Sequence, residues 1–289
     1  MRFFLTLSYD GSAFCGWQVQ PNASTVQECL EASLSTLLKE RVSVVGAGRT
    51  DSRVNAIGYV AHFDYDRVID TAKLGCKLNA ILPASIVIHD VSPAAGDTSG
   101  VPLEALPHAR FSAKRREYTY FLHRTKDPFV EAFSFFCPWG LDVEAMNRAA
   151  QALLGTHDFS CFEKVGSDNR TSVCTVTEAF WAPYRPAHVA LTGYRPACGS
   201  IVSDAGEGYL YFRISADRFL RNMVRAVVGS LLEVGRGRRS AEDFAALVLP
   251  VSGDGDQERK RTDAEGTPLR SLAGESVPGK ALFLSGIDY

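Results

Sequence analysis

Segments with strand-like and helix-like patterns alternate along this chain in two successive sets, and this alternation restricts the fold more than any other feature. In the first set, residues 3–9 alternate apolar and polar side chains as a strand does. Thr25 and Glu28 have the spacing of a capping box, and the helical pattern that they open continues to about residue 38. Further strands are expected near 42–46, 57–64 and 85–91, with a helix near 70–81.

A stretch rich in proline, glycine, alanine and serine, residues 92–107, separates the two sets and is expected to be a linker or a long loop. After it we expect strands at 117–123, 172–182, 208–215 and 281–289, and helices near 142–154 and from Asp217 to Val234, closed by Gly235. The segment from Val251 to Gly279 is unusually polar and glycine-rich. A chain of 289 residues is long enough for two modest α/β domains, which we expect at 1–106 and 107–289.

The loop of residues 46–56, GAGRTDSRVNA, joins two expected strands and places Arg49, Thr50 and Asp51 at a strand end. Three interpretations are open. In the first, Asp51 caps a turn or pairs with Arg49. In the second, Gly46 and Gly48 begin a nucleotide-binding G-x-G-x-x-G pattern, although Asp51 replaces its third glycine and no clear helix start follows. In the third, Asp51 is a nucleophile or a general acid or base, oriented by an arginine.

The charge of the chain is unevenly distributed. A net charge of −2 is far from the basic character expected of a nucleic-acid-binding protein. Residues 213–239, however, contain seven arginines and two acids, and Lys114, Arg115 and Arg116 form a second basic cluster. Solvated protein faces and phosphate contacts explain these clusters about equally well on charge alone.

Composition excludes several classes of protein. No apolar run approaches the length of a membrane span, and the N-terminus has one basic residue before an early turn, unlike a secretory signal. The seven cysteines are scattered without a C-x-x-C pair, so we expect reduced, mostly buried thiols rather than disulfides or zinc ligands. The histidines show no ligand spacing. We therefore expect a cytoplasmic protein with no metal, no cofactor and no membrane association.

The loop at 46–56 is similar to GRTDAGVHA, the signature of the TruA family of tRNA pseudouridine synthases, in which the aspartate is catalytic. Six other blocks resemble those of the family in the same order. They are YDGSAFCGWQVQPNASTVQ at 9–27, AHF at 61–63, LNAILP at 78–83, HARFSAKRREYTY at 108–120, RAAQALLGTHDFSCF at 148–162 and FLRNMVRAVVGSLLEVGRG at 219–237. Blocks in this order are far more specific than one Arg-Thr-Asp tripeptide.

The resemblance implies an α+β pseudouridine synthase fold, in which two similar halves share a largely antiparallel sheet with a cleft between them. It implies Asp51 as the catalytic residue, Tyr118 as the residue that stacks on the target base and moves the C5 proton, and Arg225 as the partner of the aspartate. A helix is expected to begin at Asp217. Its spacing is expected to place Arg218, Arg221 and Arg225 together beside the apolar stripe. Because both basic clusters lie inside family blocks, we expect substrate contacts from Arg49, Arg116, Arg221, Arg236, Arg238 and Arg239.

The implied reaction converts uridine in RNA to pseudouridine, at positions 38–40 of the tRNA anticodon stem-loop, in a homodimer that holds one tRNA across both subunits. Whether Asp51 acts as nucleophile or base stays open. Ser52, Arg53 and Asn55 depart from the family's Ala, Gly and His, and Arg53 is expected to give the loop a different φ because it replaces a glycine. These departures leave open an RNA-binding paralogue without catalysis, and Gly46 and Gly48 leave open a nucleotide-binding enzyme.

Overall fold

The computed structural model describes residues 1–94, 101–167, 169–192, 208–251 and 269–289. Contacts between Cα atoms group the chain into two compact units. Unit 1 comprises Met1–Arg116 with Phe283–Tyr289, and unit 2 comprises Glu117–Leu282. The division therefore falls after Arg116, whereas the expected one followed residue 106, and the closing strand lies with the N-terminal half. That strand joins its unit through contacts with residues far away in sequence, which no local pattern reveals.

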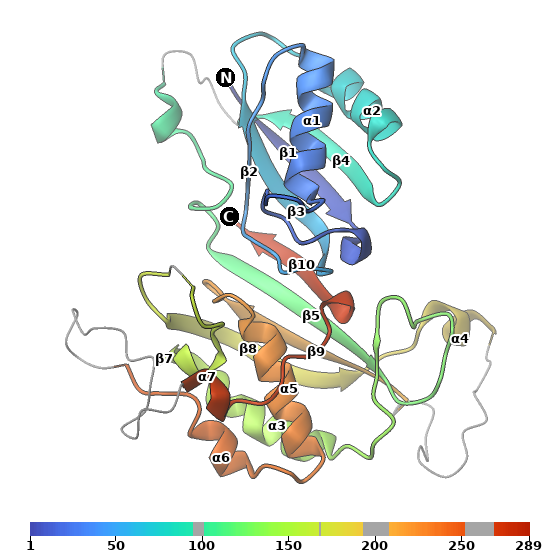
Figure 1. The fold of residues 1–289 in the computed structure, drawn as a ribbon, viewed down its shortest axis with the longest axis vertical. Helices are drawn as coiled ribbons and strands as arrows, with labels where there is room; N and C mark the ends of the chain where they lie inside the picture. The colour runs from blue at the N-terminus through green and yellow to red at the C-terminus, as the bar shows by residue number, and fades with distance from the viewer. Residues whose placement is uncertain (95–100, 168, 193–207, 252–268) are drawn as a thin grey trace. The chain divides into compact units, whose positions relative to one another are not determined.

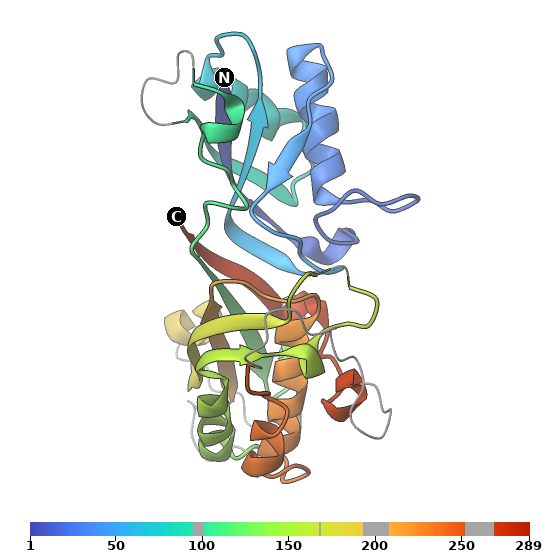
Figure 2. The same ribbon diagram turned by 90° about the vertical axis from the view of Figure 1, so that its left-hand side faces the viewer.

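Unit 1 is a mostly antiparallel sheet with two helices (Figure 1). The central strand β1 (Arg2–Tyr9) pairs antiparallel with β3 (Asn55–Asp64) on one side and with β4 (Ile86–Pro93) on the other. Strand β2 (Val44–Gly46) pairs antiparallel with β3, and β10 (Leu282–Asp288) pairs parallel with β3. Helices α1 (Val26–Leu38) and α2 (Thr71–Ile81) lie side by side on this unit, as Figures 1 and 2 show.

The sequence patterns explain these elements directly. Phe3, Leu5 and Leu7 of β1 are buried while the residues between them are only half-buried, which is the alternation expected of a strand with one covered face. The Thr25 hydroxyl accepts a hydrogen bond from the Glu28 N–H at 3.4 Å and so caps α1. Capping and strand alternation thus confirm the predicted first half.

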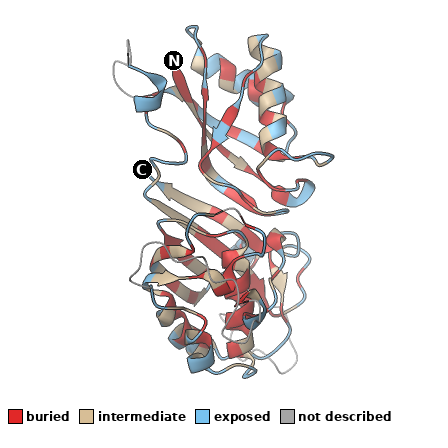
Figure 3. Ribbon diagram, turned by 60° about the vertical axis from the view of Figure 1, so that its left-hand side comes forward, coloured by how far each residue is buried: buried red, intermediate tan, exposed pale blue. Residues whose placement is uncertain are grey.

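Unit 2 contains a second mostly antiparallel sheet region, with the strand order β5 (Arg115–His123), β9 (Tyr209–Ala216), β8 (Val173–Pro183) and β7 (Gly155–Asp158). The short strand β6 (Phe135–Phe136) pairs parallel with β5. The helices are α3 (Val143–Ala150), α4 (Ala187–Thr192), α5 (Met223–Gly235), α6 (Ala241–Ala245) and α7 (Leu269–Leu272). Helix α5 is the buried centre of this unit, and the red of Figure 3 is dense along it.

The predicted start of α5 at Asp217 is wrong, because the helix begins only at Met223. The Asp217 carboxylate accepts hydrogen bonds from the N–H groups of Thr175 and Arg218, at 2.8 and 2.7 Å, and holds the preceding segment as a turn. Asn222, with φ +66°, then leads into the helix. Arg218 and Arg221 therefore precede α5 and do not share a helical face with Arg225.

Both units combine helices with a mostly antiparallel sheet, which confirms the predicted α+β class. The cleft expected between the halves stays a prediction. Cys137, Cys161 and Cys174 are buried free thiols as expected, whereas Cys15 and Cys76 are exposed. Cys198 and most of the polar segment 251–279 lie outside the described residues. Among the described helices, none has the length and apolar character to span a membrane.

Candidate active site

The loop that carries Asp51 connects β2 to β3 in unit 1. A dinucleotide-binding glycine loop would lead from a strand into a helix, whose N-terminus holds the phosphates. Here the loop leads into the ten-residue strand β3. The nucleotide-binding interpretation of Gly46 and Gly48 is therefore wrong for this chain.

Three aromatic side chains lie beneath this loop and hold its backbone. The rings of Trp17 and Tyr59 are 4.3 Å apart at their centroids, and Tyr9 packs against both. The Tyr59 hydroxyl accepts a hydrogen bond from the Gly48 N–H at 3.3 Å and donates one to the Gly48 carbonyl. The Tyr9 hydroxyl bonds the Thr50 Oγ1 at 2.9 Å. These hydrogen bonds hold the backbone of Gly48 and the side chain of Thr50, just before Asp51.

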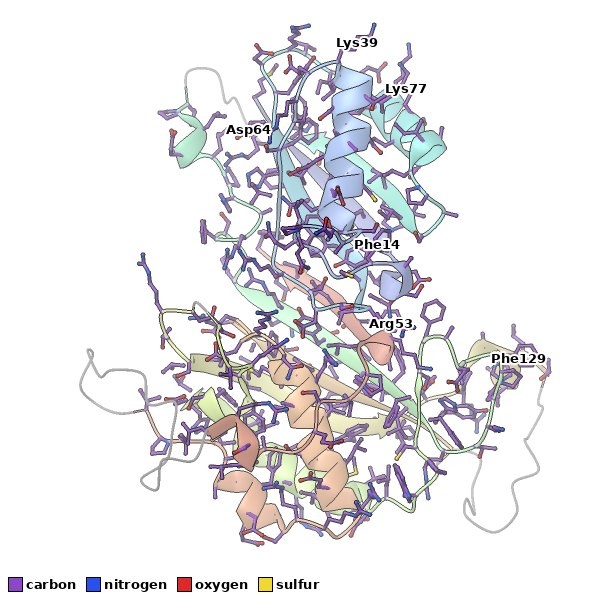
Figure 4. All side chains as sticks on the ribbon, viewed as in Figure 1. Phe14, Lys39, Arg53, Asp64, Lys77 and Phe129 are labelled. Carbon is purple, nitrogen blue, oxygen red and sulfur yellow. The ribbon has the colours of Figure 1, made fainter. Side chains whose placement is uncertain are left out.

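The first sequence block braces the same loop from the side. Gly16 has φ +91°, and a Cβ there would lie 2.3 Å from the Thr50 carbonyl oxygen, so only glycine allows this close approach. The Trp17 N–H donates to that carbonyl at 3.3 Å. On the far side of Asp51, the Arg53 N–H donates to the Phe14 carbonyl at 3.1 Å, and Figure 4 labels both residues. The block at 9–27 therefore has a structural role next to the catalytic candidate.

Asp51 lies half-buried on this braced backbone, and its carbonyl accepts the Val54 N–H at 3.2 Å to close a turn. Arg53 has φ +65°, in the left-handed region that favours glycine, and the expected difference from the backbone of the family stays a prediction. Asn55 is buried, and its Oδ1 accepts the Gly11 N–H at 2.8 Å. Both departures from the family signature are accommodated without removing the support of Asp51.

Two expected substrate arginines, Arg49 and Arg116, also lie at this loop. Arg49 is exposed and its Nε donates to Gln18 Oε1 at 3.2 Å. Arg116 donates to the Ala47 carbonyl from Nε at 3.2 Å and from Nη2 at 2.8 Å, and Nη2 also bonds the Arg110 carbonyl at 2.7 Å. Arg116 thus anchors the start of the loop through its backbone.

An open cavity of about 200 Å³ adjoins the loop. Arg49 and Arg110 line it together with Trp17, Gln18 and Gly48. Arg110 is exposed, and its guanidinium carbon lies 5.6 Å from the centre of the Phe111 ring. Arg110 is not among the predicted substrate residues, although it lies in the block at 108–120. An arginine followed directly by an aromatic residue, Phe111, was the sequence signal that could have found it.

The other two catalytic candidates lie in unit 2. Tyr118, on β5, is buried, and its ring meets that of Phe219 edge to face at 5.0 Å. Arg225, in the first turn of α5, donates from Nε to the Val277 carbonyl at 2.7 Å. Tyr120, also on β5, is fully buried. Burial raises the pKa of its phenol, and the nearby Arg225 opposes this rise.

Comparison with known proteins decides the family. A model of the tRNA pseudouridine synthase family matches residues 6–97 and 149–267. The chain belongs to this family. A relative named tRNA pseudouridine synthase A from Bacteroides thetaiotaomicron is 39% identical over 289 residues, which cover all of this chain and 90% of the relative. Proteins of the same name from Porphyromonas gingivalis and Bacillus licheniformis are 39% and 37% identical, with all of this chain and 97% and 99% of the relatives covered.

The segments matched to the tRNA pseudouridine synthase family contain Asp51 and Arg225, whereas Tyr118 lies between them. The structure places Asp51, Arg49 and Arg116 around one loop of unit 1, and it places Tyr118 and Arg225 in unit 2. No group of three His, Cys, Asp or Glu side chains suited to a metal ion is found among the described residues.

The remaining arginines of the basic cluster at 213–239 differ in their surroundings. Arg221 and Arg238 are exposed. The Arg236 guanidinium lies 3.8 Å from the centre of the Trp139 ring, a close cation–π contact. Arg239 donates from Nε to Glu233 Oε2 at 2.9 Å. Whether these residues contact substrate stays a prediction, and the exposed pair has the least internal competition for a phosphate.

Proposed function

We propose that this member of the tRNA pseudouridine synthase family isomerises uridines at positions 38–40 of the tRNA anticodon stem-loop, with Asp51 as the catalytic residue. In this reaction the bond between N1 and C1′ of the uridine breaks and a bond between C5 and C1′ forms. The C5 proton leaves, and N1 takes up a proton. The reaction transfers no electrons and no external group, so side chains alone can promote it.

The observation that supports this proposal most strongly is the bracing of Asp51 within a family-matched segment. Tyr59 holds Gly48, Tyr9 holds Thr50, and Phe14 holds Arg53, so the backbone on both sides of the carboxylate is fixed. A carboxylate that must approach C1′ or C6 of a sugar-linked base within bonding distance gains from such fixed geometry, because a small misplacement costs much of the rate.

Tyr118 and Arg225 are proposed as the other two catalytic residues. A phenol can stack on a uracil that has left its helical stack, and it can carry the C5 proton. A guanidinium can orient a carboxylate through paired hydrogen bonds, which is the role we propose for Arg225 towards Asp51. Both assignments come from the resemblance of their sequence blocks to the family.

The finer parts of the proposal concern the assembly and its location. We propose a homodimer in the cytoplasm that binds one tRNA across both subunits, with phosphates held by Arg49, Arg110, Arg221 and Arg238. The exposure of these four guanidinium groups supports the choice. Arg49 and Arg110 line one cavity beside the Asp51 loop, which suits the phosphates that flank a flipped nucleotide.

Release of the C5 proton tests the catalytic claim. Unmodified tRNA carrying tritium at C5 of uridine should lose label to water when incubated with the protein. The Asp51→Asn variant keeps the size of the side chain but loses its charge, so it should bind tRNA with similar affinity and release no label. Release by Asp51→Asn at the wild-type rate would exclude Asp51 as the catalytic residue.

A second candidate function, an RNA-binding paralogue without catalysis, is motivated by Arg53 and Asn55. It predicts tRNA binding with no release of label from the wild-type protein. Restoration of release by the Arg53→Gly, Asn55→His double variant would then establish it.

A further inference from the structure

A segment of unit 2, residues 273–278, runs along helix α5 and is called the strap here. The Gly274 N–H donates to the Ser230 Oγ of α5 at 2.8 Å. Near the start of the helix, Asn222 Nδ2 donates to the Ser276 Oγ at 2.6 Å. Between these two points the Val277 N–H donates to the Arg225 carbonyl at 3.2 Å. Hydrogen bonds therefore hold the strap along α5, from Asn222 just before the helix to Ser230 within it.

Val277 contacts Arg225 through both polar groups of its backbone. Its N–H bonds the Arg225 carbonyl, and its own carbonyl accepts the Arg225 Nε at 2.7 Å. A guanidinium is planar, so a hydrogen bond that fixes Nε also fixes the plane in which both Nη nitrogens lie. The Pro278 carbonyl, which follows, accepts the Tyr120 hydroxyl at 3.2 Å and anchors the next peptide.

Two glycines bring the strap and the helix into backbone contact. A Cβ on Gly229 of α5 would lie 1.8 Å from the Glu275 carbonyl oxygen, which is rigid backbone. A Cβ on Gly274 of the strap would lie 2.8 Å from Glu233 Oε1 and 3.0 Å from the Ser230 Cα. Any side chain at Gly229 must therefore push the strap away from the helix at Glu275. Glu275 lies two residues before Val277, whose carbonyl accepts the Arg225 Nε.

We propose that the strap is a positioning element for Arg225, and that Gly229 is the positioning residue which sets its distance from α5. The role rests on the proposed function, in which Arg225 orients the catalytic carboxylate. Moving the strap releases Nε from the Val277 carbonyl. The guanidinium then loses the hydrogen bond that fixes its plane through Nε, so a smaller fraction of molecules has it in place for the reaction.

The test is Gly229→Ala, with Gly75→Ala as the matched control. Both glycines lie inside helices, where alanine is the better helix former. A Cβ on Gly75 would meet only the Val91 Cγ2 at 3.5 Å, an ordinary contact. Gly229→Ala should lower the single-turnover rate by on the order of 100-fold with nearly unchanged tRNA affinity, since displacement by about 1 Å has that effect. Gly75→Ala should leave the rate at the wild-type value.

A double-variant cycle separates positioning from general loosening of the fold. In an Arg225→Ala background there is no guanidinium left to orient, so adding Gly229→Ala should produce no further loss of rate. A further loss as large as that seen in the wild-type background would overturn the proposal.

A readout without catalysis keeps the strap and the proposed function separate. In NMR spectra, the Arg225 Nε–H should exchange slowly with solvent in the wild type and in Gly75→Ala, and rapidly in Gly229→Ala. An Nε–H that stays protected in Gly229→Ala would exclude positioning by the strap, whether or not the protein acts on tRNA. An inactive wild type with the expected exchange pattern would instead count against the proposed function alone.

Discussion

Arg53 is one of four described residues other than glycine that have a positive φ, together with Asn22, Lys39 and Asn222. Its φ of +65° lies in the left-handed region, which costs a side chain about 1–2 kcal/mol relative to the ordinary conformation. Glycine avoids most of that cost but loses more entropy on folding, about 0.5–1 kcal/mol. The arginine is thus tolerated at a small net cost, because the Phe14 carbonyl and the turn at Asp51 hold the backbone.

Arg53→Gly should therefore raise the free energy of unfolding by about 0.5–1 kcal/mol, the difference between these two costs. Chemical denaturation measures it. The neighbouring Ser52 is exposed and has an ordinary φ, so Ser52→Gly should lower stability by a similar amount. Equal effects of the two substitutions would show that the left-handed conformation at Arg53 carries no cost.

His62 gives the folded state a pH dependence. It is 2% exposed, and its Nδ1 accepts the Ala109 N–H at 3.1 Å, so its neutral form is the one that fits. Burial, helped by Arg2 and His108, lowers its pKa from 6.5 to about 4. The unfolded state then binds the proton more readily than the folded state between these values. The contribution of neutral His62 to the stability of the fold is therefore fully present above pH 6.5, and it is lost as the pH falls towards 4.

We expect the free energy of unfolding to fall by up to about 3 kcal/mol across that window because of His62. In His62→Asn, the amide oxygen can still accept the Ala109 N–H but cannot be protonated there. Denaturation curves at several pH values should show a smaller slope for this variant. An unchanged slope would assign the acid sensitivity to other groups.

At the scale of elements, local patterns were predictable from the sequence, whereas hydrogen bonds between distant residues were not. The capping of α1 by Thr25 and the alternation of β1 are local, and both were predicted. The bond from Arg116 to Ala47 joins residues 69 positions apart, and that from Arg225 to Val277 joins residues 52 apart. Such partners follow from the packed fold, so the sequence identified the candidate residues but not their supports.

Short elements escaped prediction for a related reason. Strand β6 has two residues and helix α7 has four in the structure, too few to show a periodic pattern. The start of α5 was predicted too early because Leu220, in the segment before the helix, continues the apolar spacing of the helix itself. There, the local hydrogen bonds of Asp217 outweigh the pattern.

Tyr59→Phe tests the support of the Asp51 loop as an element. Removing the hydroxyl leaves the half-buried Gly48 N–H and carbonyl without this partner, which should cost about 1 kcal/mol of stability. It should also slow single-turnover conversion, because the loop that positions Asp51 is less fixed. Tyr209→Phe removes a phenol that donates to Asp127 at 2.6 Å and should lower stability without slowing conversion. Equal rates for both variants would contradict the bracing role.

At the scale of the whole molecule, charge distribution decides how a protein with a net charge of −2 binds a polyanion. Each of the two basic clusters has an arginine that forms an ion pair within the protein, since Arg239 pairs with Glu233 and Arg115 with Asp288. Exposed arginines are then the main candidates for phosphate contacts. Each such contact should make the slope of log affinity against log salt more negative, by roughly 0.7–0.9.

Replacing Arg236, Arg238 and Arg239 with alanine should flatten that slope and lower the affinity for different tRNAs to the same extent. The single-turnover rate at saturating tRNA should be nearly unchanged. Most of the effect should come from Arg238, the exposed member of the three. Arg67→Ala is the control, because Arg67 is also exposed but lies outside both clusters. A triple variant with the slope of the Arg67→Ala control would place the phosphate contacts elsewhere.

Site-resolved mapping of pseudouridine in unmodified tRNA tests the central claim most directly. After incubation with the purified protein, pseudouridine should accumulate with time at uridines 38, 39 and 40, and nowhere in a parallel sample with Asp51→Asn. Unchanged uridines at all three positions, with tRNA bound to the protein, would contradict the account.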